Sequence, residues 1–75
     1  MKLQKFIKKV NLEKFPNITL HDEFGCYDFD DIVKGGVIKE KVLNEHAEDE
    51  VTDESPDHLT VGPCGTYAIH LKTDE

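Results

Sequence analysis

Residues 17–30 read NITLHDEFGCYDFD, and this stretch decides the fold. Apolar and polar residues alternate over 17–21 and again over 26–30, the period of a half-buried β-strand. The residues between the two runs are typical of a turn, in which Gly25 tolerates a positive φ. The stretch therefore predicts a β-hairpin. The side of it expected to face the core carries Ile18, Leu20, Tyr27 and Phe29.

The preceding residues predict an amphipathic helix that covers this hairpin. Leu3, Phe6, Ile7 and Val10 follow the spacing i, i+3, i+4, i+7 and form one apolar stripe. Pro16 prevents continuation, because the residue before a proline is pushed out of helical geometry. So short a helix is marginal in water by itself and must lie on an apolar surface. Its solvated face carries Lys2, Lys5, Lys8 and Lys9.

The second half predicts a further hairpin, with strands over 58–61 and 66–71 around the turn residues 62–65. A short helix fits between residues 37 and 47, and residues 48–57 form an acidic loop. The sequence thus predicts one α+β domain over 1–75. It has two layers, in which the N-terminal helix packs on a small antiparallel sheet of two β-hairpins, with the short second helix between them. The uncovered sheet face is expected to show Thr19, His21, Asp28, Asp30, Thr60, Thr66 and His70.

The charge composition narrows the function classes. The 75 residues contain 9 basic and 16 acidic side chains, a formal net charge of −7, and no arginine. Arginine is the preferred residue for bidentate phosphate and guanine contacts, so direct nucleic-acid binding is not expected. No uncharged apolar run approaches the roughly 18 residues of a membrane span. The lysines scattered among the first ten residues are unlike a secretory signal, which predicts a cytoplasmic protein with reduced thiols.

The acidic residues themselves are the strongest functional signal. Residues 22–31 hold five acids and residues 44–58 hold seven, with no basic residue in either segment. If the two segments fold side by side, they form one negative surface that binds a basic protein in place of nucleic acid. Solvation of an ordinary acidic face is the alternative. The predicted partner contacts are Asp28, Asp30, Asp31, Glu48, Asp49, Glu50, Asp53 and Glu54.

Phe24 adds a candidate apolar contact, because it lies in the predicted turn. An exposed aromatic side chain there would serve as a binding anchor, whereas a core role is the alternative. Self-association through a sheet edge is a further possibility for so small a sheet.

Metal binding and catalysis are less well supported. His21, Asp22, Cys26 and Asp28 lie close in sequence, but zinc sites use paired cysteine and histidine spacings that this chain lacks. Residues 28–33 also fail the calcium-loop pattern. A nucleophilic pairing of Cys64 with His58 or His70 needs a base within reach and a site that excludes water, which a turn between two strands does not supply. We therefore expect no catalytic residue, no cofactor and no enzymatic activity.

The layout resembles small α+β accessory proteins of phages and prophages. The resemblance is carried by the start MKLQKFI, the strand over 18–22, the acidic middle and the closing strand YAIHL at 67–71. Such proteins include inhibitors of host defence nucleases, so the resemblance implies an inhibitor that acts as a nucleic-acid mimic. The expected function is therefore a non-enzymatic acidic accessory protein that binds a nucleic-acid-handling protein. The alternatives are a small self-associating structural protein, a homodimer among the options, and a metal-binding module.

Overall fold

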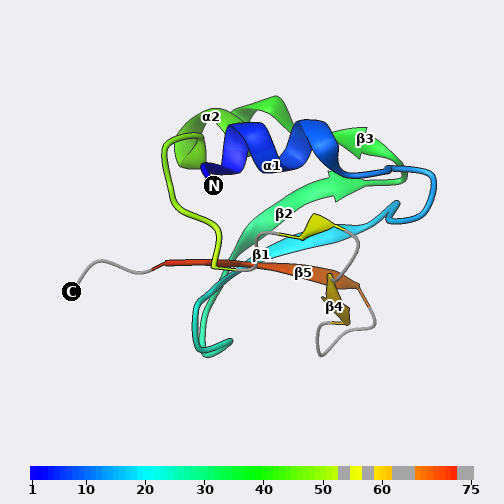
Figure 1. Cartoon of the computed structure of the whole chain (residues 1–75). Helices are drawn as coiled ribbons and strands as arrows, with labels where there is room; N and C mark the ends of the chain where they lie inside the picture. The colour runs from blue at the N-terminus through cyan, green and yellow to red at the C-terminus, as the bar shows by residue number, and fades with distance from the viewer. Residues whose placement is uncertain (53–54, 57–58, 62–65, 73–75) are drawn as a thin grey trace.

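The fold is α+β, as predicted, with both helices on one face of a mixed sheet (Figure 1). The computed structural model describes residues 1–52, 55–56, 59–61 and 66–72. Within these residues, neither helix is long and apolar enough to cross a membrane. The elements are α1 (Leu3–Lys9), β1 (Ile18–Asp22), β2 (Asp28–Lys34), β3 (Val37–Ile38), α2 (Glu40–His46), β4 (Thr60–Val61) and β5 (Tyr67–Leu71).

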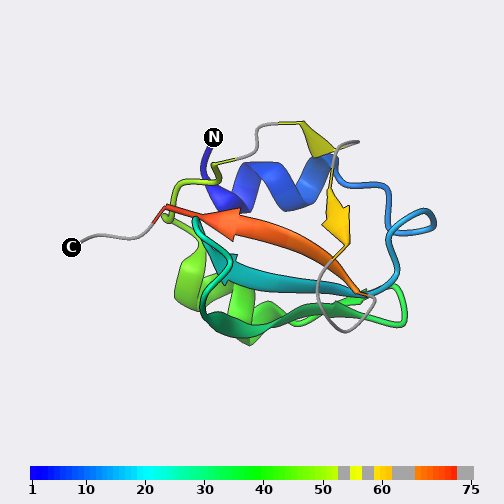
Figure 2. The same ribbon diagram turned by 90° about the horizontal axis from the view of Figure 1, so that it is seen from below.

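The described strands form one sheet in the order β3-β2-β1-β5-β4. Both predicted hairpins are present, as the antiparallel pairs β1–β2 and β4–β5. The all-antiparallel sheet is corrected in one pair, because β1 and β5 run parallel (Figure 2). Burial explains the difference. Ile69 and Leu71 of β5 are fully buried, whereas β4 is exposed. Strand β5 therefore takes the interior position beside the central strand β1, and β4 is left at the edge.

Strand β2 differs from the prediction in where it starts and what it buries. It begins at Asp28, so Tyr27 belongs to the turn and is exposed. Two register shifts interrupt its pairing with β1, and Phe29 stays largely exposed at the border with α2. The strand instead buries Ile32 and Val33 further along. The strand over 26–30 was therefore predicted too early, and its expected core residues are wrong.

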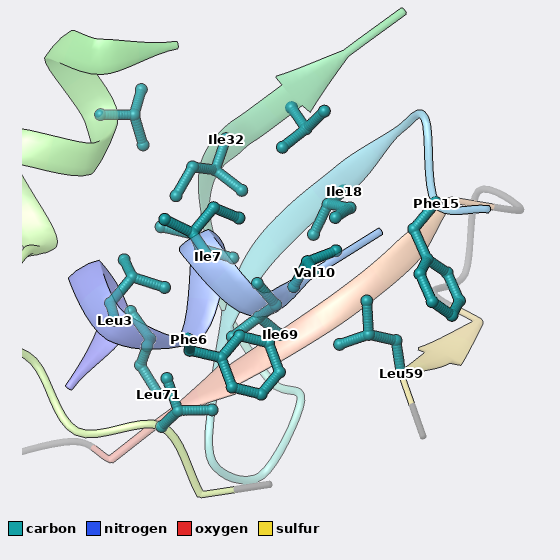
Figure 3. Close-up of a cluster of buried hydrophobic side chains, with 14 residues drawn as sticks. Leu3, Phe6, Ile7, Val10, Phe15, Ile18, Ile32, Leu59, Ile69 and Leu71 are labelled. Atoms are coloured by element: carbon teal, nitrogen blue, oxygen red, sulfur yellow. The ribbon is translucent and has the colours of Figure 1, made fainter. Parts of the chain in front are cut away.

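The hydrophobic core lies between the helices and the sheet (Figure 3). The predicted stripe of α1 is confirmed, with Leu3, Phe6 and Ile7 buried and Val10 at its end. From the sheet, Ile18, Leu20, Ile32, Ile69 and Leu71 complete the layer. Because this layer lies on one face only, the functional groups collect on the other face and at the strand ends.

The chain between β2 and α2 is a second tight turn. Gly35 and Gly36 both adopt positive φ and connect β2 to the short edge strand β3. The predicted break at these glycines is therefore a hairpin turn. Helix α2 follows within the predicted range, and its Val42 packs into the core. Both edge strands, β3 and β4, are two residues long, which offers little edge for another chain to pair with.

Candidate protein-binding turn

The β1–β2 turn, residues 23–27, extends from the sheet on the side away from both helices (Figure 1). Asp22 organises it from a buried position, with only 3% of the residue exposed. Its carboxylate Oδ1 accepts hydrogen bonds from the amides of Cys26 at 2.6 Å and Tyr27 at 3.2 Å. Its carbonyl accepts from the amide of Gly25 at 3.0 Å, and Gly25 has a φ of +72°. These bonds fix the backbone of the turn, as in other aspartate-capped turns.

The organised turn presents two aromatic side chains to solvent. Phe24 is 74% exposed and Tyr27 is 71% exposed. The core role considered for Phe24 is therefore excluded, and its exposure agrees with the expectation of an apolar anchor. Cys26, which lies between Phe24 and Tyr27 in sequence, is also exposed. Because leaving a large apolar side chain in water forgoes about 1.5–3 kcal/mol of burial, two such side chains on one fixed turn are a marked feature of this small domain.

Beneath the turn, His21 sits in a hydrogen-bonded chain. Its ring is buried, which corrects the expectation of an exposed histidine on this face. Nδ1 lies 2.6 Å from Oδ1 of Asp28, and Nε2 lies 2.5 Å from the hydroxyl of Thr19. His70 of β5 is opposite His21 in the parallel register, and the ring centroids are 5.8 Å apart. The base of the turn is thus tied to both central strands.

Thr19, His21 and Asp28 are connected in the order of a nucleophile, a base and an orienting acid. The surroundings of the three residues differ from those of a catalytic triad. Asp28 is mostly exposed, whereas a catalytic orienting acid is normally buried. A hollow of about 80 Å³ opens on the sheet, and its lining includes Asn17, Asp31 and Lys34 but none of Thr19, His21 and Asp28. In the part of the chain that the structure describes, the Thr19 hydroxyl is a hydrogen-bond partner of His21.

The metal alternative finds no support in the residues that the structure describes, which contain no group of three or more metal-ligating side chains. Of its four candidates, Asp22 is engaged by backbone amides and His21 by Thr19 and Asp28. The Sγ of Cys26 lies 3.9 Å from the carbonyl of Phe24. The pairing of Cys64 with His58 lies outside the described residues.

The predicted acidic contacts on β2 are divided by the strand. Asp28 and Asp30 are exposed next to the turn, and among the described residues no lysine forms an ion pair with either. Oδ1 of Asp30 accepts a bond from the amide of Asp31. Asp31 itself is half-buried and lines the hollow together with Lys34. The turn therefore has two acidic neighbours from β2, and the third belongs to a different surface.

The predicted contacts after α2 are occupied within the chain. Glu48 bonds to the ammonium of Lys2 and to Gln4, and Glu50 lies 3.0 Å from the N-terminal amine of Met1. Asp49 lies 2.7 Å from Nδ1 of His46. The hydrogen bond with Lys2, together with its charge, lowers the pKa of Glu48, and Glu48 in turn raises the pKa of Lys2. Asp53 and Glu54 lie outside the described residues.

One contact connects the two acidic segments. The ring of Phe29 in β2 lies 5.5 Å from the ring of His46, which bonds to Asp49. The two segments therefore approach one another at this contact. The expected uniform negative surface is nevertheless corrected, because the segment after α2 is partly neutralised by the N-terminus and Lys2.

Three lysines lie at the end of the molecule away from the turn. Lys8 and Lys9 form the last turn of α1, and Lys34 ends β2. These element ends lie at the opposite end of the molecule from the β1–β2 turn (Figure 1). These three lysines therefore lie away from the turn, whereas Lys72 directly follows Leu71, the register partner of Asp22 at the base of the turn.

Tyr27 is the functional candidate that the sequence prediction missed, since it was assigned to the core. The signal was the aspartate at position 22, whose side chain can bond to amides four and five residues later and so extend the turn to Tyr27.

No protein-family model, no curated protein and no solved structure matches this chain.

Proposed function

We propose that this chain is a non-enzymatic acidic protein-binding protein, which docks its β1–β2 turn into a basic surface of a partner protein. The proposal depends above all on one observation, the exposure of Phe24 and Tyr27 on a turn that Asp22 holds in one conformation. Aromatic side chains dominate the energetics of protein interfaces, and a fixed backbone reduces the entropy lost on binding.

The chemistry around the turn selects the partner. Asp28 and Asp30 are exposed in the strand that follows the turn, and Lys8, Lys9 and Lys34 end α1 and β2 at the opposite end of the molecule. A complementary surface combines an apolar slot with surrounding lysine or arginine side chains. Carboxylates can occupy basic grooves that otherwise hold phosphates, so the partner class that we propose is a nucleic-acid-handling protein. The resemblance to phage accessory proteins suggests that the consequence of docking is inhibition of that partner.

The experiment compares capture by the wild type and two double variants. Immobilised protein is exposed to a bacterial lysate, retained proteins are identified by mass spectrometry, and the Kd of each purified candidate is measured by calorimetry. Phe24→Ala/Tyr27→Ala removes both rings of the turn. Val37→Ala/Val61→Ala is the matched control, because it trims two comparably exposed apolar side chains on the edge strands. We expect Kd to rise at least about 100-fold in the turn variant and by less than about twofold in the control.

The acidic half of the proposal is tested separately. Asp30→Asn removes one charge beside the turn, and Glu13→Gln removes one charge from the chain that follows α1. The first should weaken binding by about threefold to tenfold at low salt, an effect that disappears near 0.5 M salt, where the Debye length is only a few ångströms. Equal changes of Kd in the turn variant and in the edge-strand control would mean that docking is not specific to the turn, and they would contradict the proposal. A sedimentation mass of two chains that is lost in the turn variant would mean that Phe24 serves self-association instead, and it would also contradict the proposal.

A further inference from the structure

We propose that protonation of the paired histidines beneath the turn, His21 and His70, loosens the turn and so makes docking sensitive to pH. The inference rests on the proposed function, since it assigns regulation to the same turn. Its physical basis is nevertheless independent of any partner, because it concerns hydrogen bonds within the isolated chain.

The hydrogen bond to Asp28 fixes the tautomer of His21. An ionised carboxylate only accepts hydrogen bonds, so the bond to Asp28 places a proton on Nδ1. In the neutral ring, Nε2 then accepts from the hydroxyl of Thr19. The same hydroxyl lies 3.5 Å from the carbonyl oxygen of Tyr67. When His21 gains its second proton, Nε2–H donates to the Thr19 oxygen, and the hydroxyl donates to Tyr67 instead.

His21 can therefore become charged without leaving a buried polar atom unsatisfied. Its positive charge is balanced by Asp28 at 2.6 Å. The first proton taken up by the pair consequently leaves the turn intact, and it strengthens the bond between the base of β1 and the start of β2. A single protonation is thus compatible with the folded turn.

The second proton has the opposite effect. His70 lies opposite His21 on β5, with the ring centroids 5.8 Å apart, so two imidazolium rings would repel one another at short range. The turn lies directly on His70, since a Cβ added at Gly25 would be 3.7 Å from its Nε2. Among the described residues, Asp28 of β2 is paired with His21, and Asp22 of β1 accepts bonds from the turn amides. Relief of the repulsion therefore requires movement of His70 and of the turn above it.

Histidine is the side chain that most commonly changes its charge between pH 5 and 8, so the experiment adds protons to the pair by lowering the pH across this range. The expected result is a turn that is fixed at pH 7 and loosened near pH 5.

The test measures amide hydrogen exchange by NMR in the isolated chain. The reporters are the amides of Cys26 and Tyr27, which bond to Asp22, and the internal reference is the amide of Phe6 in α1. After correction for intrinsic exchange, we expect protection of the turn amides to fall about tenfold between pH 7 and pH 5, with protection of Phe6 unchanged. His70→Gln should abolish the fall, because it removes the second charge.

His46→Gln is the matched control, since His46 belongs to the separate network of Phe29 and Asp49. This variant should keep the tenfold fall. The ring signals of His21 and His70 in the wild type provide a readout that does not depend on any variant, and the signals of both rings should move together with the loss of protection. An unchanged turn in the wild type, or a fall that persists in His70→Gln, overturns the inference. Failure of turn variants to affect capture would instead contradict the proposed function alone.

Discussion

The two acidic segments of this chain look alike in sequence but differ in what they do with their charge. Around the β1–β2 turn, one carboxylate is buried to hold backbone amides, and Asp28 and Asp30 remain at the surface without a lysine partner among the described residues. After α2, Glu48, Asp49 and Glu50 each bond to a positively charged or titratable group of the chain. The difference teaches that the density of acids in a sequence does not measure the negative surface that a fold presents.

The largest effect should follow from the buried carboxylate. Asp22→Ala removes the acceptor of two amides, and leaving them unpaired should lower the free energy of unfolding by about 2–4 kcal/mol. Asp22→Asn keeps an acceptor oxygen in place and should lower it by about 1 kcal/mol or less. Urea denaturation of both variants measures the difference. Equal losses would mean that the buried charge, rather than the hydrogen bonds, fixes the turn.

Local patterns were sufficient for the parts of the fold that depend on neighbours in sequence. The spacing of Leu3, Phe6 and Ile7 predicted α1, and the alternation around Leu20 predicted β1. Both depend on a period that each segment carries by itself. The place of β5 beside β1 depends instead on competition between β4 and β5 for the centre of the sheet, which becomes visible only when whole strands are compared.

The sequence placed one of the two exposed aromatic residues of the turn correctly and the other wrongly. Phe24 was correctly placed in a turn, because Gly25 follows it. Tyr27 was missed, because strand alternation was applied where hydrogen bonds to Asp22 prevail. The pairing of Glu48 with Lys2 joins residues 46 positions apart, a separation over which no local pattern operates.

A smaller effect is expected at the edge of the turn, where Asp28 meets His21. Asp28→Ala should lower the free energy of unfolding by about 1 kcal/mol at pH 7, because the exposure of Asp28 reduces the value of a bond that is strong when buried. A double-mutant cycle with His21→Gln isolates the pair, and the coupling should account for about half of that loss. No measurable coupling would mean that Asp28 belongs to the surface, like Asp30, and does not support the turn.

The smallest effect belongs to the segment after α2, and its sign follows from the pKa of Glu48. Lys2 lowers that pKa below 4.5, so the pair stabilises the fold at pH values above 4.5 and loses this contribution as the pH falls through the lowered value. At the alkaline end, the pKa of Lys2 is raised above 10.5, so the contribution is full below 10.5 and is lost as the pH rises through the raised value.

Glu48→Gln should therefore lower Tm slightly at neutral pH, and the difference from the wild type should shrink as the pH falls below 4.5 and as it rises above 10.5. Both side chains are exposed, so added salt should shrink the same difference at pH 7. Thermal denaturation at three pH values and two salt concentrations measures it. If the difference persisted in acid, the role of Glu48 would not be electrostatic. The segment would then resemble the turn, where a carboxylate acts through the backbone it holds, and the contrast between the two acidic segments would be lost.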